Sequence, residues 1–121
     1  MTHTPDLTPT LRPVDYHLHQ GSIVGEQYHL KDIAAVRKAR HADPDEEITV
    51  EAWLVAEPEN LHDRMAIKVM VGDHHVAHIK RGDNTLLRLR GALSDNGGRL
   101  GPFMIEITAG DEWVAPAICF L

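Results

Sequence analysis

The chain has 121 residues, of which 43% are hydrophobic and 25% are charged, and these values suit one domain with one modest core. No apolar run approaches the roughly 18–20 residues of a membrane span, and the first residues lack the basic-then-apolar pattern of a signal peptide. The net charge of −6 argues against non-specific nucleic-acid binding, and the single cysteine, Cys119, excludes an internal disulfide and favours a cytoplasmic location.

The first part of the chain predicts a tail followed by short elements. Residues 1–13 are polar and contain three prolines, so we expect a flexible N-terminal tail, with residues 14–121 forming a single domain. Val14–Val24 alternates imperfectly and predicts one or two short strands, with Gly25 at a bulge or a close backbone approach. Residues 30–41 place apolar side chains at helical spacing and predict a short helix.

The middle of the chain predicts three strands. Residues 47–57 alternate cleanly, so Ile48, Val50, Ala52, Leu54 and Ala56 should share one face, and Thr49, Glu51, Trp53 and Val55 the other. "AIKVMV" (66–71) and "HHVAHIK" (74–80) are two further strands, joined by the two-residue turn "GD".

The last third predicts a helix and two strands. Residues 81–93 carry leucines at helical spacing, with Asp83 or Asn84 as a plausible N-cap. "SDNGGRLG" is expected to be a loop, and residues 102–108 and 112–121 a final antiparallel pair. The order indicates a mainly β fold with two short helices, in the form of a small OB-like or SH3-like antiparallel barrel.

Charge is unevenly distributed. Residues 43–60 hold acidic residues without Lys or Arg, whereas most charges between Arg64 and Arg99 are basic. This pattern allows a local basic face on an acidic protein, or mixed charges on a solvated surface.

The segment "EPENLHDRMAIKV" (57–69) concentrates polar side chains just before a buried strand. The Asn60 amide can donate and accept, and the Asp63 carboxylate accepts strongly, so the pair could bind a group outside the chain. Equally, both side chains could cap the turn by accepting backbone N–H groups.

Three blocks together resemble the HIRAN domain family: "IVGEQYH" (23–29), "EPENLHDRMAIKV" (57–69) and "HHVAHIKR" (74–81). The resemblance covers roughly residues 20–95. It implies an OB-type barrel that binds the 3′ end of single-stranded DNA, as a standalone module that acts beside a helicase or nuclease in repair, replication or a phage-related process.

The resemblance also implies roles for individual residues. Tyr28 would stack on a terminal base, Asn60 and Asp63 would contact the terminal nucleotide and its 3′ hydroxyl, and His78 and Arg81 would lie near the phosphates. Gln27 stands where the family has an arginine, and His62 where it has a second tyrosine. With Lys68 and Lys80 as further phosphate partners, the predicted nucleic-acid site comprises Gln27, Tyr28, Asn60, His62, Asp63, Lys68, His78, Lys80 and Arg81.

The sequence therefore predicts a binding module without enzymatic activity, cofactor or resident metal. The alternative is a protein-interaction module on the same barrel that has lost DNA binding, with Trp53 and Val55 on its sticky face. A zinc ion held by His62, His74 and His78, and with it a metal-dependent hydrolase, is a further alternative, because His74 and His78 share a face in a regular strand.

Overall fold

The computed structural model describes residues 10–110 and 114–121. Its core is one antiparallel six-stranded sheet with the order β1-β4-β3-β2-β5-β6. The edge strands β1 (Ile23–Val24) and β6 (Ile118–Phe120) contact each other, so the sheet is nearly closed into a barrel. The predicted class, mainly β with two short helices, is confirmed. None of the described helices is both long and apolar enough to cross a membrane.

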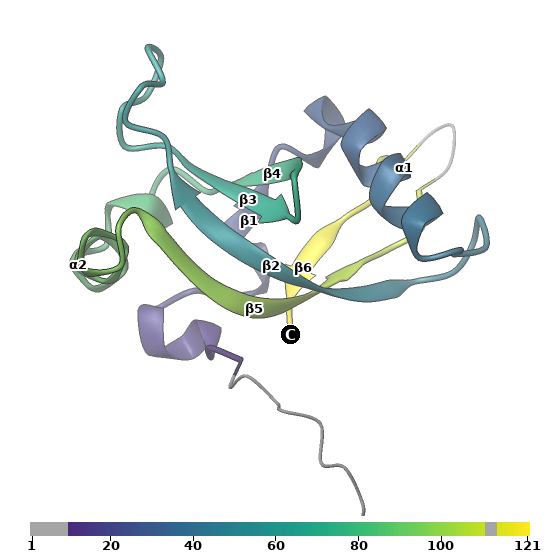
Figure 1. Ribbon diagram of the computed structural model, residues 1–121, viewed down its shortest axis with the longest axis horizontal. Coiled ribbons are helices and arrows are strands. Elements are labelled where there is room, and N and C mark those ends of the chain that lie inside the picture. The colour runs from purple at the N-terminus through teal and green to yellow at the C-terminus, as the bar shows by residue number, and fades with distance from the viewer. Residues whose placement is uncertain (1–9, 111–113) are drawn as a thin grey trace, which may run out of the picture.

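The two helices lie at opposite ends of the long strands β2 (Ile48–Ala56) and β5 (Arg99–Ile107), as Figure 1 shows. Helix α1 (Leu30–Ala39) packs against β4 (His74–Ile79), and α2 (Leu87–Asp95) packs against β2 and β5. The barrel interior is filled by aliphatic side chains together with Phe103 and Phe120, whose rings meet edge to face at 5.4 Å.

The central strands follow the predicted pattern. Ile48, Val50, Ala52 and Leu54 of β2 are buried, and the residues between them are exposed or half-buried. Strand β3 (Ile67–Val71) pairs with β4 through the predicted two-residue turn, in which Gly72 has φ 56°.

The segment before Gly25 differs from the predicted strands. Residues 13–22 contain two short 3₁₀ turns, η1 (Pro13–Tyr16) and η2 (Gln20–Ser22), and the paired strand is confined to β1. The His19 side chain accepts from Gly21 N, and Ser22 Oγ accepts from His19 N. These local bonds compete with strand pairing, which explains the difference. Gly25 is left-handed, with φ 84°, and begins the 3₁₀ turn η3 (Glu26–Tyr28).

Two other boundaries were predicted wrongly. Asp83 and Asn84 do not cap α2: both donate their backbone N–H to Lys80 O and form the 3₁₀ turn η4 (Asp83–Thr85), and α2 begins after Leu86 without a side-chain cap. The expected loop "SDNGGRLG" (94–101) contributes its first residues to α2 and its last to β5.

At the two termini, only part of each prediction falls on described residues. Of the expected tail, residues 10–13 are described, and Leu11 packs on the core and donates its N–H to Pro102 O. The final pair is confirmed where β6 runs antiparallel to β5, and residues 111–113 of the predicted last strand lie outside the described ranges.

Candidate functional site

The outer face of the sheet, opposite the core, carries a row of side chains that crosses five strands. Directly paired residues in an antiparallel sheet share a face. Two cations and a histidine therefore lie in one line across β1, β4, β3, β2 and β5. The paired residues along this line are Val24↔His78, His78↔Lys68, Lys68↔Val55 and Val55↔Arg99. We call this line of residues the outer row.

Trp53 lies beside the outer row. The Arg99 guanidinium lies 4.7 Å from the centroid of the Trp53 ring, in a cation–π arrangement. The ring lies close to Gly101 of β5, where an added Cβ atom would come within 2.8 Å of Trp53 Cδ2. A hollow lined by Tyr16, Trp53, Arg99 and Gly101 adjoins this stack. An aromatic surface and a fixed positive charge thus meet at one end of the row.

A bulge in β4 sets which histidines face outward. Val69 pairs with Ala77 and Met70 with His75, so Val76 is an extra residue in β4. Val76 and Ala77 are consequently both fully buried, and His75 and His78 both lie on the outer face. The prediction that His74 and His78 share a face is wrong, because it assumed a regular strand.

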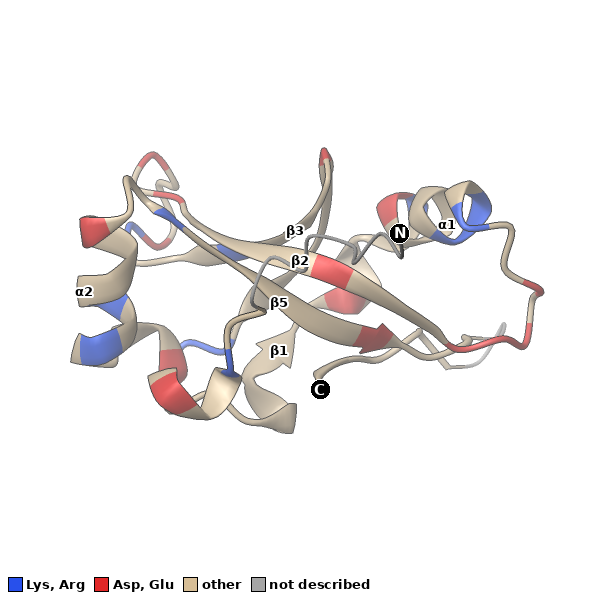
Figure 2. Cartoon of the chain, turned by 60° about the horizontal axis from the view of Figure 1, so that its bottom comes forward, with Lys and Arg blue, Asp and Glu red and all other residues tan. Residues whose placement is uncertain are grey.

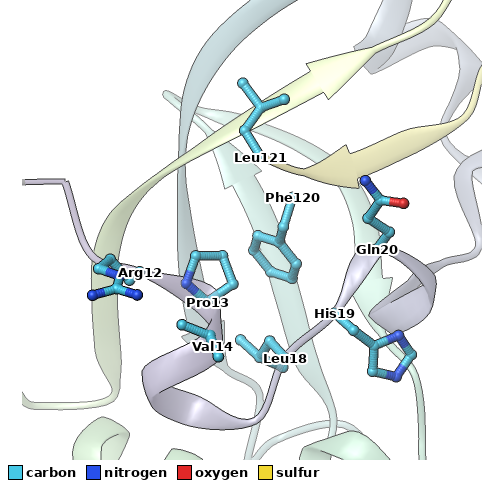
Figure 3. A pocket seen from close by; sticks show the side chains of 8 residues that line it. All are labelled: Arg12, Pro13, Val14, Leu18, His19, Gln20, Phe120 and Leu121. Carbon is cyan, nitrogen blue, oxygen red and sulfur yellow. The ribbon is translucent and has the colours of Figure 1, made fainter.

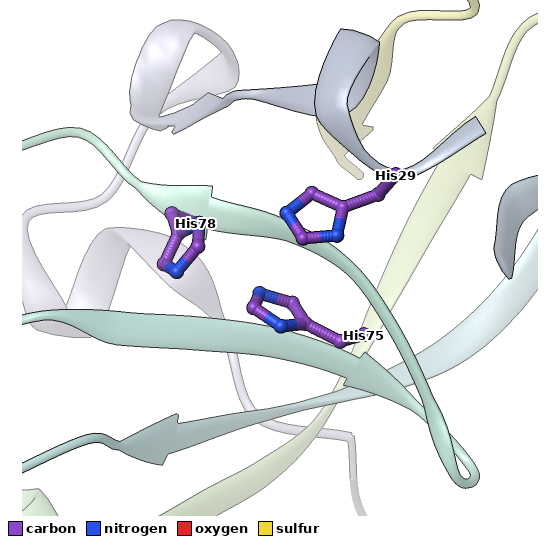
Figure 4. Close-up of side chains that lie close together, drawn as sticks. All are labelled: His29, His75 and His78. Carbon is purple, nitrogen blue, oxygen red and sulfur yellow. The ribbon is translucent and has the colours of Figure 1, made fainter. Parts of the chain in front are cut away.

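His29 joins His75 and His78 from the turn before α1, and the three rings converge in Figure 4. The ring centroids of His29 and His75 are 4.1 Å apart, and those of His75 and His78 are 4.5 Å apart. Burial, reinforced by the neighbouring imidazoles, lowers the pKa of His75 to about 4 and also lowers the pKa of His29. Both rings are therefore neutral near pH 7 and carry a free nitrogen lone pair.

Carboxylates hold two of the strand β4 histidines. His78 Nε2 lies 2.9 Å from Glu57 Oε1, and His74 Nδ1 lies 3.1 Å from Asp32 Oδ1 of α1. His62 is exposed in the loop between β2 and β3. The zinc set predicted from the sequence, His62 with His74 and His78, is therefore not brought together. The sequence did not assign His29 and His75 to a metal site. His29 lies far from β4 along the chain, and the bulge at Val76 has no signature in the sequence.

The side chains of Asn60 and Asp63 accept hydrogen bonds from the backbone of their own turn. Asn60 Oδ1 accepts from the backbone N–H groups of His62 and Asp63 at 2.9 and 3.1 Å, and Asp63 Oδ1 accepts from Met65 N at 2.9 Å. Within the described residues, the Asn60 amide nitrogen and Asp63 Oδ2 make no hydrogen bond. The predicted role in the turn is thus confirmed for the Oδ1 atoms of both side chains. The Asn60 amide nitrogen and Asp63 Oδ2 are free for a ligand.

The remaining predicted residues are dispersed over the surface near β1 and β4. Gln27 and Tyr28 are exposed in η3, with Tyr28 80% exposed, and η3 contacts β4. Lys80 and Arg81 are exposed just past β4, where Lys80 N donates to Ser22 O. In the described part of the chain, no hydrogen bond joins Tyr28 to Asn60 or Asp63.

Two other surface features of the chain are an acidic loop and an apolar pocket. Figure 2 shows acidic residues gathered in the loop between α1 and β2, and basic residues on both helices. A further pocket, shown in Figure 3, has apolar walls from Val14, Leu18 and Phe120 and one cation, Arg12. Neither feature presents a set of reactive groups.

No protein-family model matches the chain, and no curated protein and no solved structure resembles it at a significant level.

Proposed function

We propose that the chain is a non-enzymatic module that binds single-stranded DNA along the outer row and recognises a 3′ end at the loop of residues 57–66. The observation that carries the proposal is the juxtaposition of Lys68 and Arg99 with the Trp53 ring on one face. Single-stranded nucleic acids bind where cations follow the phosphates and aromatic rings stack on bases.

Tyr28 supports the same function at the other end of the row. Its ring is exposed in η3, directly after β1, and so offers a second stacking surface beyond Val24 and His78. Lys80 and Arg81 lie exposed just past β4 and can neutralise further phosphates. Because stacking and phosphate contacts read no base edges, sequence preference is weak.

End recognition rests on the free atoms of Asn60 and Asp63. A 3′ hydroxyl can donate to Asp63 Oδ2 and accept from the Asn60 amide, whereas a 3′ phosphate would be repelled by the carboxylate. The neighbouring positions Gln27 and His62 lack the cation and the larger ring that the HIRAN-like pattern expects. We therefore expect this module alone to bind DNA with modest affinity. A helicase or nuclease partner would supply the additional DNA contacts.

Fluorescence anisotropy with labelled oligonucleotides tests this proposal. The ligands are 3′-hydroxyl and 3′-phosphate single strands and a blunt duplex, each measured over a salt series. Lys68→Ala should weaken single-strand binding and reduce the slope of log K against log salt by about 0.7. Lys38→Ala removes the same charge from α1 and should leave both the single-strand affinity and the salt slope unchanged. Equal affinity for the two 3′ ends would remove the end-recognition claim.

A protein-interaction module is the second candidate. Its specific support is the exposure of Leu61 and Met65, 88% and 42%, at the loop of residues 57–66, together with the net charge of −6. Absence of salt-dependent DNA binding, combined with capture of a partner that survives nuclease treatment, would favour it over the first proposal.

A further inference from the structure

We propose that His29, His75 and His78 form a binding site for a divalent transition-metal ion, with zinc the best-matched metal. Each of the three residues presents one ring nitrogen, and these nitrogens all lie within 4.8 Å of one another. Imidazole nitrogen is a preferred ligand of zinc, copper and nickel and a poor ligand of magnesium and calcium. Three histidines with no carboxylate among them therefore select the transition metals.

The backbone brings the ligands together from two separate segments. His75 and His78 face outward on β4 because Val76 forms the bulge, and His29 approaches from the turn before α1. Nitrogen ligands of a tetrahedral zinc ion lie about 3.3 Å apart, given Zn–N distances of about 2.0–2.1 Å. Binding a tetrahedral ion therefore requires the three ring nitrogens, which lie within 4.8 Å of one another, to move closer together.

Two histidines of the cluster, His75 and His78, make hydrogen bonds of the kind that metal-binding histidines make. Such residues donate their second ring N–H to a carboxylate or a backbone carbonyl. The Glu57 carboxylate accepts, so His78 Nε2 donates to Glu57 Oε1 at 2.9 Å, and Glu57 does not engage Nδ1. His75 Nε2 lies 3.0 Å from Ala77 O, which can only accept, so that nitrogen carries the proton. Coordination through Nδ1 of His75 and His78 is therefore the mode that is compatible with both hydrogen bonds.

The site is half-buried, so a fourth ligand can come from solvent. Three protein ligands and one exchangeable position are the arrangement of open zinc sites, which take water or an anionic oxygen. The site borders the outer row through His78 but does not depend on nucleic-acid binding. Metal titration in the absence of DNA therefore tests it separately from the proposed function.

The experiment uses the full chain without a histidine tag, stripped of metal by dialysis against a chelator. Zn²⁺ is titrated by calorimetry, and Co²⁺ by the visible absorption that tetrahedral coordination intensifies. We expect one ion per chain. His75→Gln and His29→Gln should each weaken Zn²⁺ binding by about 100-fold or more. His74→Gln and His62→Gln, which remove histidines outside the cluster, should change it less than about threefold.

Failure of the wild-type chain to take up either ion would overturn the proposal, and so would an equal loss of affinity in His74→Gln or His62→Gln. Because His29→Gln risks disturbing the start of α1, histidine ring resonances of the wild-type chain are also recorded before and after addition of Zn²⁺. Shifts centred on His29, His75 and His78 support the site. Shifts centred on other histidines exclude it.

Discussion

His78 on β4 and Glu57 at the end of β2 are joined by a 2.9 Å hydrogen bond between Nε2 and Oε1. The bond fixes the ring of His78 from the side of the loop of residues 57–66, while Gly25, with its left-handed backbone, passes near Nδ1. One side chain thus links the proposed metal cluster to the loop that carries Asn60 and Asp63.

Glu57→Gln should lower the Zn²⁺ affinity of the cluster by about tenfold. The amide oxygen can still accept from His78, but it lacks the charge that raises the basicity of the ligating nitrogen. The matched control is Asp32→Asn, which alters the other carboxylate–histidine pair, at 3.1 Å from His74. Calorimetric titration of both variants should separate them, and an equal effect would show that Glu57 acts only through general charge.

Gly101→Ala should destabilise the fold by about 1–3 kcal/mol. The new Cβ atom would lie 2.8 Å from Trp53 Cδ2 and 3.0 Å from Ala52 O, so either the indole ring or the strand must move. Gly91 of α2 provides the control, because a Cβ atom there meets nothing within 4 Å, and Gly91→Ala should stabilise by about 0.5–1 kcal/mol. Denaturant unfolding of both variants measures the two opposite changes, and a Gly101→Ala variant as stable as the wild type would contradict the packing argument.

The sequence predicted the strands whose alternation is regular and failed where one residue breaks it. Strand β2 was predicted with its faces because burial along it keeps a period of two. "HHVAH" also reads as a regular strand, yet Val76 and Ala77 are both buried, so the outward pair is His75 with His78. Nothing local in the sequence distinguishes a bulged strand from a regular one, because the bulge is set by pairing with β3.

The candidate site was predictable only in part for the same reason. Lys68 and Tyr28 were assigned to the candidate site from the sequence, whereas Arg99 was not. Its position over Trp53 depends on the register between β2 and β5, which shifts between Ala52 and Leu54.

Glu26→Gln should become more stable relative to the wild type as pH rises. Burial raises the pKa of the Glu26 carboxyl, opposed by the backbone N–H groups of Glu26 and Ile118. A carboxyl with a raised pKa in the folded state contributes its full stability below pH 4.5, and that contribution is lost as pH rises through the folded value.

Unfolding free energies of wild type and Glu26→Gln, measured from pH 4 to pH 8, test this expectation. The difference should grow in favour of the variant above pH 4.5 and then level off, and it should stay below about 1 kcal/mol because solvent partly screens the group. A difference that is independent of pH would contradict the assigned cause.

Asn60→Ala should cost about 1–2 kcal/mol, because Asn60 Oδ1 accepts two backbone N–H groups that would lose their partner. Asn60→Asp keeps an oxygen at that position and should retain most of the stability, but it removes the amide donor proposed to contact the 3′ hydroxyl. Denaturant unfolding together with anisotropy separates the two roles. An Asn60→Asp variant that is stable and binds 3′-hydroxyl DNA as well as the wild type would leave Asn60 with the turn role alone.

Tyr28→Ala should weaken single-strand binding by about 5- to 150-fold, which corresponds to the loss of about 1–3 kcal/mol for one stacked base. Tyr28→Phe keeps the ring and should bind within about threefold of the wild type. Because the side chain is 80% exposed, both variants should unfold within about 0.5 kcal/mol of the wild type, so any loss of binding reflects the surface itself. Leu87→Ala, an equally exposed apolar truncation on α2, is the control. If Tyr28→Ala binds as the wild type does, or if Phe is as poor as Ala, base stacking on this ring is excluded.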